Sequence, residues 1–178
     1  LIQALKTKLE EEKIHLTTGF VGTPYLCPVL TENGLGEYAY TLLLNEDFPS
    51  WLYEVNMGAT TIWERWNSVL PDGSISDTGM NSLNHYSYGS IVEWMYRYMC
   101  GINPDEHKTG FRKFTIHPYP DQRFKYVIAE YRSAYGLIKS GWEKTKEGWL
   151  FRVTVPFDTE SEFILEEKIR KLAAGNIQ

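Results

Sequence analysis

The sequence predicts a protein of two parts, a helical half over residues 1–103 followed by an antiparallel β half over residues 104–178. Two observations predict this division. Before residue 104, apolar side chains recur at helical spacing in several segments; after it, the segments are short, β-branched or aromatic, and separated by turn residues. Helices followed by strands without alternation favour two units over one interleaved α/β fold.

In the first half, four stretches are predicted to be helical: residues 1–13, 28–45 with an interruption near residue 33, 51–56 and 85–100. Ile2, Leu5 and Leu9 recur with the period of a helix in the first of them. Ser50 is the residue type that caps a helix start, and Gly101 is the residue type that ends one. The connections between these helices are long and aromatic, so we expect them to carry function or to pack on other parts of a protein.

In the second half, five strands are predicted, at residues 111–116, 124–135, 137–142, 149–155 and 162–165. Lys146-Glu147-Gly148 separates two of them and is typical of a hairpin tip. The chain starts at Leu1 inside a helical pattern, without an initiating Met. A natural mature terminus and a cut within a larger protein both give such a start, and both interpretations stay open at this point.

The composition is that of a globular chain, and it narrows the classes of partner. Among 178 residues, 18 Lys and Arg stand against 23 Asp and Glu, which gives a net charge of −5. Such a chain is a poor candidate for holding nucleic acid or an anionic membrane by bulk charge, and no apolar run approaches the ~20 residues of a membrane-spanning helix. Cys27 and Cys100 are too few for a disulfide scaffold and lack a zinc spacing. We therefore expect reduced or buried thiols, no metal and no cofactor.

Aromatic residues are abundant, with 6 Trp, 12 Tyr and 8 Phe making up 15% of the chain. Aromatic rings pack protein cores, and they also stack on the C–H faces of sugars. The composition therefore leaves two interpretations open, a core built from large side chains and a carbohydrate-binding surface.

The densest group of chemically useful residues is the segment Thr60-Thr-Ile-Trp-Glu-Arg-Trp66, in which Glu64 stands between Trp63 and Trp66 and beside Arg65. Flanking rings exclude water from a carboxylate, and a carboxylate in that setting suits a general base that activates a water molecule. The alternative is an exposed Glu–Arg pair between two core tryptophans, and spacing alone does not decide between them.

A second group, Asn81-Ser-Leu-Asn-His-Tyr86, lies where a helix is predicted to start. Polar groups and free backbone N–H groups at a helix start can point into a cleft, so His85 is a candidate for contacting a sugar hydroxyl. The alternative is helix capping by Ser82 or Asn84, with His85 packed on the helix. Glu93 and Asp77 are weaker candidates for acid–base chemistry, because each is expected at a solvated or turn position.

Taken together, these motifs make the sequence resemble the C-terminal part of bacterial α-L-rhamnosidases, family 78 of the glycoside hydrolases. The matching segments run in order through nearly the whole chain. They are Thr31-Glu-Asn-Gly34, Tyr40-Thr-Leu-Leu-Leu44, Gly58-Ala-Thr-Thr-Ile-Trp-Glu-Arg-Trp66, Met80-Asn-Ser-Leu-Asn-His-Tyr-Ser-Tyr-Gly89, Val92-Glu-Trp94 and the β segment from Gly136 to Pro156.

The resemblance implies that residues 1–103 are the last helices of an (α/α)6 catalytic barrel and that residues 104–178 are most of a C-terminal β-sandwich. It also implies an inverting hydrolase for terminal α-L-rhamnose, in which one carboxyl group protonates the leaving oxygen and another activates water. Glu64 matches the family's general base, and His85 matches a residue that contacts rhamnose. Trp63 and Trp66 lie beside the base, and we infer that they stack on the sugar. No motif here matches the family's general acid, so this chain alone is expected to be inactive.

The sequence leaves other roles open for the chain. It is alternatively a non-catalytic carbohydrate-binding fragment, in which case Trp142 and Trp149 of the β half are the candidate sugar platforms, or a structural fragment. Core packing is the competing interpretation for both tryptophans. Because half a barrel would leave apolar interface exposed, we also expect self-association or a complementary partner chain.

Overall fold

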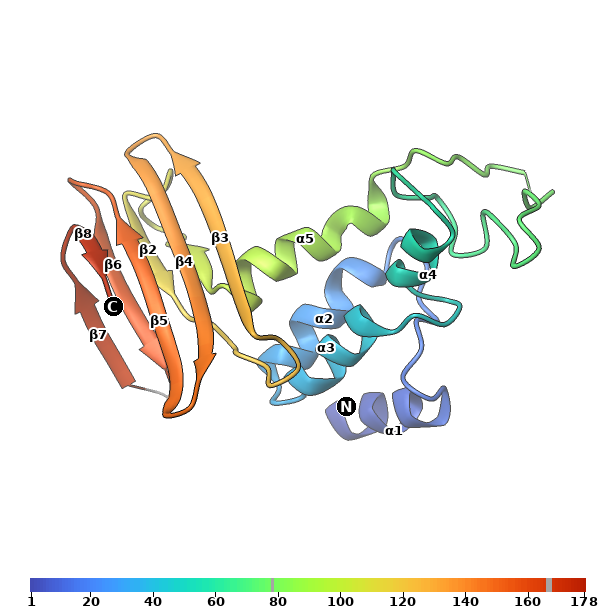
Figure 1. Cartoon of the computed structure of the whole chain (residues 1–178), viewed down its shortest axis with the longest axis horizontal. Coiled ribbons are helices and arrows are strands. Elements are labelled where there is room, and N and C mark those ends of the chain that lie inside the picture. Colours follow the sequence, from blue (N-terminus) through green and yellow to red (C-terminus); the bar gives the residue numbers. More distant parts are fainter. Residues whose placement is uncertain (78, 166–167) are drawn as a thin grey trace. The chain divides into compact units, whose positions relative to one another are not determined.

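A computed structural model describes residues 1–77, 79–165 and 168–178 of the chain. It contains two compact units, residues 1–92 and residues 93–178. The first unit is built from helices and long connections, and the second is built mainly from strands, as Figure 1 shows. No described helix is long and apolar enough to cross a membrane.

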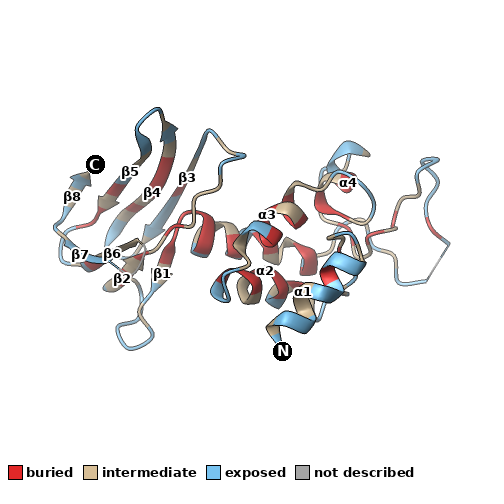
Figure 2. Cartoon of the chain, turned by 90° about the horizontal axis from the view of Figure 1, so that it is seen from below, coloured by how far each residue is buried: buried red, intermediate tan, exposed pale blue. Residues whose placement is uncertain are grey.

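The first unit contains helices α1 (Ile2–Glu11), α2 (Thr23–Glu32), α3 (Gly36–Leu44) and α4 (Trp51–Asn56). Much of the burial in this unit falls on α2 and α3 (Figure 2), where Leu30, Ala39 and Leu42 are completely buried. The prediction of a helix over residues 28–45 was wrong about where the helix starts, because α2 begins at Thr23. Pro24 stands in the first turn of α2, where a missing N–H breaks no hydrogen bond.

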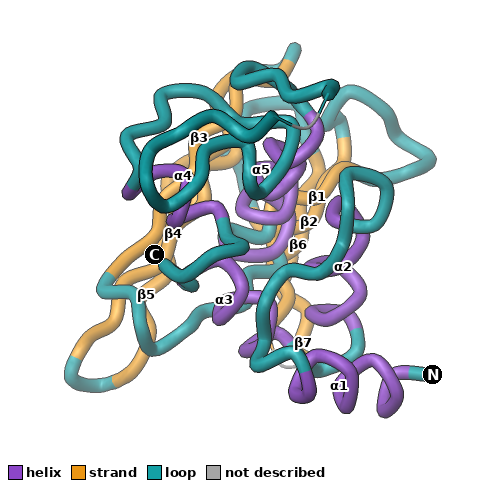
Figure 3. Tube along the Cα trace, turned by 90° about the vertical axis from the view of Figure 1, so that its right-hand side faces the viewer, coloured by secondary structure: helices purple, strands orange, loops and turns teal. Residues whose placement is uncertain are grey.

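The predicted cap of α4 is confirmed, because the Ser50 side chain accepts a hydrogen bond from the backbone N–H of Tyr53 at 3.0 Å. After α4 the chain runs through a long connection, coloured as loop in Figure 3, before it reaches the 3₁₀ turn η1 (Ser87–Ser90). Within this connection, Val69 and Ile75 form an isolated antiparallel bridge.

The predicted helix over residues 85–100 is confirmed in position, but it starts later and is not uniformly α-helical. It consists of η1, a short α-helix α5 (Ile91–Trp94) and a π-helical turn η2 (Met95–Met99). Gly101 follows at a backbone φ of +77°, a left-handed conformation that favours glycine, and this confirms the predicted stop.

In the second unit, the described strands form two four-stranded sheets. One sheet has the order β1-β2-β6-β7, with bounds Ile102–Pro104, Lys113–Ile116, Glu160–Leu165 and Lys168–Leu172. The other has the order β3-β4-β5-β8, with bounds Tyr126–Ser133, Gly136–Thr145, Gly148–Val155 and Gly175–Ile177. Strands β4 and β5 form the predicted hairpin, with Thr145 paired to Gly148 across its tip.

The two sheets share one hydrophobic core, which confirms a sandwich. Phe114 and Ile116 of one sheet and Ile138 and Val153 of the other belong to the same buried cluster. The prediction of an antiparallel β half holds for every described pairing except β2 with β6, which run parallel. Cys27 and Cys100 are free and buried, as expected, and burial raises the pKa of both thiols to about 12.

Candidate active site

The fold brings the two predicted motifs together, although they lie far apart in the connection from α4 to α5. The backbone N–H of Glu64 donates to the carbonyl of Ser82 at 2.9 Å, and the N–H of His85 donates to the carbonyl of Ile62 at 2.8 Å. The hydroxyl of Thr61 donates to the carbonyl of Leu83 in the same zone. Segments 61–64 and 82–85 therefore lie side by side, which places the candidate residues Glu64 and His85 on neighbouring segments.

The Glu64 side chain is half-buried and is held by one backbone hydrogen bond. Its Oε2 accepts from the N–H of Ser82 at 2.7 Å, and within the described part of the chain Oε1 accepts no hydrogen bond. The alternative of a Glu64–Arg65 pair is not what the structure has. The Arg65 guanidinium instead donates to the carbonyls of Gly79 and Met80, at 3.2 and 3.1 Å, and so holds the loop that precedes Ser82.

The two tryptophans that flank Glu64 are buried, with Trp63 3% exposed and Trp66 8% exposed. Trp66 stacks on Tyr88, with 3.7 Å between ring centroids, meets Trp51 edge to face, and donates its indole N–H to the carbonyl of Thr18. Their burial favours the packing alternative over an open sugar platform in this chain. Their contacts fix the backbone on both sides of Glu64.

His85 is half-buried and lies just before η1 rather than inside a helix. Its Nδ1 accepts a hydrogen bond from the N–H of Ser87 at 3.4 Å, so a neutral ring carries its proton on Nε2. Its ring stacks on the exposed ring of Tyr86, with centroids 5.0 Å apart. Helix capping by Ser82 or Asn84 is not what the structure has, because the N-cap of η1 is Tyr86, without a side-chain cap hydrogen bond. The Ser82 hydroxyl instead accepts from the N–H of Asn84 at 3.1 Å, in the segment before η1.

Glu54 is a site residue that the sequence analysis missed. It lies on α4 and is only 2% exposed, and its Oε2 accepts from the backbone N–H of Trp63 at 3.3 Å. Its Oε1 is buried without a hydrogen-bond partner among the described residues, and burial raises the pKa of this carboxyl to about 7. The available signal was its spacing of three residues from Trp51, which places both on one helix face.

The weaker candidates stay at the surface. Glu93 is exposed and forms an ion pair with Arg97 at 3.1 Å, and Asp77 is exposed in the connection. No group of three or more His, Cys, Asp or Glu side chains that could hold a metal ion occurs among the described residues.

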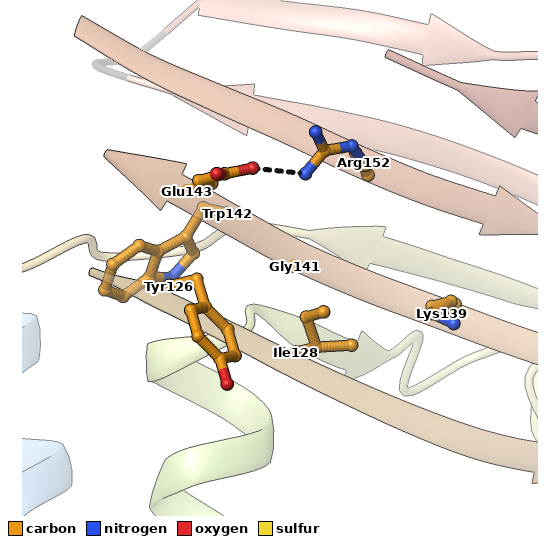
Figure 4. Close-up of a pocket in the computed structure, with 7 residues that line it drawn as sticks. All are labelled: Tyr126, Ile128, Lys139, Gly141, Trp142, Glu143 and Arg152. Atoms are coloured by element: carbon orange, nitrogen blue, oxygen red, sulfur yellow. Dashed lines mark hydrogen bonds and ion pairs between the residues drawn. The ribbon is translucent and has the colours of Figure 1, made fainter. Parts of the chain in front are cut away.

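The β half presents a shallow pocket of about 190 Å³ on β3, β4 and β5, drawn in Figure 4. Tyr126 and Ile128 lie on one side of it, and the ion pair between Glu143 and Arg152 lies on another. The proposed tryptophan platform is not formed: Trp142 is 1% exposed and meets Trp149 at an interplanar angle of 81°. A flat sugar-binding surface needs coplanar exposed rings, and these two rings do not provide one.

Comparison with known proteins gives two family matches that together cover nearly the whole chain. Residues 2–99 match the family described as the bacterial alpha-L-rhamnosidase 6 hairpin glycosidase domain. Residues 101–177 match the bacterial alpha-L-rhamnosidase C-terminal domain.

Curated relatives agree with this assignment. The chain is 42% identical over 154 residues to an alpha-L-rhamnosidase of Streptomyces avermitilis, covering 86% of this chain and 15% of that protein. It is 44% identical over 160 residues to an alpha-L-rhamnosidase of Formosa agariphila, covering 90% of this chain and 17% of that protein. The chain therefore spans less than a fifth of the length of these relatives.

Solved structures show the same fold. The crystal structure of the S. avermitilis alpha-L-rhamnosidase complexed with L-rhamnose matches 97% of this chain and 18% of its own, with a TM-score of 0.89 and 35% identity. The crystal structure of the native alpha-L-rhamnosidase from Aspergillus terreus matches 96% of this chain and 20% of its own, with a TM-score of 0.87 and 31% identity. The chain belongs to the bacterial α-L-rhamnosidase family, of which it comprises six-hairpin glycosidase helices and the C-terminal β domain.

Proposed function

We propose that this chain acts as part of an inverting α-L-rhamnosidase that hydrolyses terminal α-L-rhamnose from glycans or glycosides. The observation that carries the proposal is the pairing of segments 61–64 and 82–85, which brings Glu64 and His85 into one site in a chain of this family. The L-rhamnose complex of the S. avermitilis relative supports the choice of sugar.

In this proposal Glu64 is the general base. Its Oε2 is held by the N–H of Ser82, and Oε1 takes a proton from a water molecule. The water oxygen attacks the anomeric carbon of rhamnose as the bond from that carbon to the leaving oxygen breaks. A general acid outside this chain protonates the leaving oxygen, and inverting enzymes hold the two carboxyl groups roughly 6.5–9.5 Å apart to leave room for the water.

His85 is proposed to donate from Nε2 to a rhamnose hydroxyl, because its Nδ1 is already engaged by Ser87. The sequence analysis inferred that Trp63 and Trp66 stack on the sugar. Their burial supports a different contribution, in which both rings hold the backbone around Glu64 from behind.

We also propose that the chain divides into two domains with different roles. Residues 1–103, the helical part, supply the base, and residues 104–178, the β part, serve as a structural domain. The crossed rings of Trp142 and Trp149 favour this role over carbohydrate binding by the β part.

The test is release of p-nitrophenol from p-nitrophenyl α-L-rhamnoside. It is run on this chain and on the same chain extended at its N-terminus through a complete barrel. We expect activity only in the extended polypeptide, because loss of a general acid alone costs ~10²–10⁴-fold. Equal activity in the short chain would place the acid within these residues, and no activity in either would refute the hydrolase.

A further inference from the structure

The peptide group between Ile62 and Trp63 is held from both ends. Its carbonyl accepts from the backbone N–H of His85 at 2.8 Å. Its N–H donates to the side chain of Glu54 at 3.3 Å. The next peptide along the chain carries the N–H of Glu64, which bonds to Ser82. A single peptide unit therefore connects Glu54, the segment that carries Glu64, and the backbone of His85.

Burial and a backbone hydrogen bond hold Glu54 in place, so that it can in turn hold this peptide unit. Glu54 lies on α4 with Trp51 and Tyr53, and all three side chains are buried. Its own backbone carbonyl accepts from the N–H of Ala59 at 3.0 Å, so the turn that follows α4 is tied to the same residue. Both ends of the segment from α4 to Glu64 are thus fixed at Glu54.

Among the residues that the structure describes, Oε1 of Glu54 has no hydrogen-bond partner, and this bears on whether the carboxyl group is ionised. An ionised carboxylate with one buried, unpaired oxygen is unfavourable, and burial raises the pKa of Glu54 to about 7. Burial raises the pKa of the neighbouring Tyr88 hydroxyl, and the charge of Glu54 raises it further. The charge of Arg65 lowers the same pKa. Glu54 therefore needs only an acceptor oxygen for the N–H of Trp63, and not a negative charge, to hold the peptide.

We propose that Glu54 is a positioning residue for the hydrolysis, which holds the Ile62–Trp63 peptide and thereby aims the Glu64 carboxylate at the attacking water. This inference rests on the proposed function, and it assigns to the site a second carboxyl group that contacts no substrate. Misplacement of a reacting group by about 1 Å can cost ~10²-fold in rate, so one backbone hydrogen bond suffices for a large effect.

The test uses the N-terminally extended polypeptide and three substitutions of Glu54. Glu54→Gln keeps an acceptor oxygen at the same reach without the charge, and we expect kcat within about threefold of the unsubstituted enzyme. Glu54→Met keeps the length but removes the acceptor, and Glu54→Asp keeps the charge but shortens the reach. We expect both to lower kcat about 10- to 100-fold with KM within threefold. Thr31→Val, which removes a buried hydroxyl bonded to Cys27 in α2, is the matched control and should keep kcat.

A double-substitution cycle separates positioning from general loss of structure. In a Glu64→Ala background the residual turnover no longer depends on where the base points, so Glu54→Met should lower it less than threefold further. An equal loss in both backgrounds would overturn the proposal, as would an active Glu54→Asp with an inactive Glu54→Gln. If Glu54→Met does not fold, the Asp and Gln pair decides. Full turnover by Glu64→Ala itself would instead refute the base assignment, whatever Glu54 does.

Discussion

Gly101 joins the end of the helical segment to the β-sandwich, and we predict that Gly101→Ala strongly destabilises the second unit. The residue has a φ of +77°, and a Cβ placed on it would lie 2.2 Å from the carbonyl carbon of His117 and 2.3 Å from the nitrogen of Pro118. Both neighbours are backbone atoms, so no side-chain rotation relieves the overlap.

The size of the effect follows from three contributions. A left-handed backbone costs an alanine about 1–2 kcal/mol. Removing the overlap requires the backbone at His117 to move, which costs ~1–3 kcal/mol in a packed region. It also weakens the hydrogen bond from the N–H of His117 to the carbonyl of Gly101, worth about 1 kcal/mol. Together these contributions lower the free energy of opening this core by about 3–6 kcal/mol.

Cys100 provides the assay, because it is buried in the same core and its labelling by a thiol reagent requires the unit to open. Labelling is followed by mass spectrometry of the Cys100 peptide. Since each 1.4 kcal/mol is tenfold, Cys100 in Gly101→Ala should be labelled roughly 10²–10⁴ times faster than in the unsubstituted chain. Gly110→Ala is the control, because it has a φ of +72° and nothing within 4 Å of the added Cβ. Rates within threefold of each other in the two variants would refute the clash.

Three further outcomes follow from the site and the buried groups. His85→Ala should raise the inhibition constant of free L-rhamnose about tenfold in the extended polypeptide, since a lost hydrogen bond is worth ~1–1.5 kcal/mol; an unchanged constant would remove His85 from the site. Cys27 and Cys100, whose pKa values burial raises to about 12, should not react with Ellman's reagent at pH 8 until denaturant is added; reaction in the native state would contradict their burial. Because burial raises the pKa of Glu54 to about 7 from 4.5, the folded state binds this proton more tightly, so its contribution to stability is full below pH 4.5 and is lost as the pH rises to about 7. Urea unfolding at pH 4.5 and 7.5 should show that Glu54→Gln, with Tyr88 and Arg65 unchanged, reduces this loss; an identical pH dependence in both proteins would contradict it.

The order and type of the main elements could be predicted because short-range sequence features determine them. Helical spacing identified α1, the cap at Ser50 identified α4, and the turn at residues 146–148 identified the hairpin. These features depend on neighbours within a few residues in the chain.

Other elements depend on contacts that sequence spacing does not carry. Strand β7 is mostly exposed, and three of its five residues are positively charged, so its pattern has no buried face to detect. The parallel pairing of β2 with β6 joins residues far apart in the chain, such as Phe114 and Ser161. The short strands β1 and β8 were missed because three residues give no period.

The candidate site shows the same limit. Glu64 and His85 were identified through their motifs, but the backbone pairing that brings them together is a tertiary contact. A pair of Arg65 with Glu64 was one alternative because the two are adjacent in sequence, but Arg65 bonds to the 79–80 loop instead. Glu54 looked like an ordinary helix residue, and only its burial and its bond to Trp63 distinguish it.

The most direct test of the account is the turnover of Glu64→Gln in the extended polypeptide, measured with p-nitrophenyl α-L-rhamnoside beside the inhibition constant for L-rhamnose. A glutamine cannot take a proton from water, so we predict that kcat falls ~10²–10⁴-fold while the inhibition constant stays within about threefold. Near-normal kcat in the Gln variant would show that Glu64 is not the base.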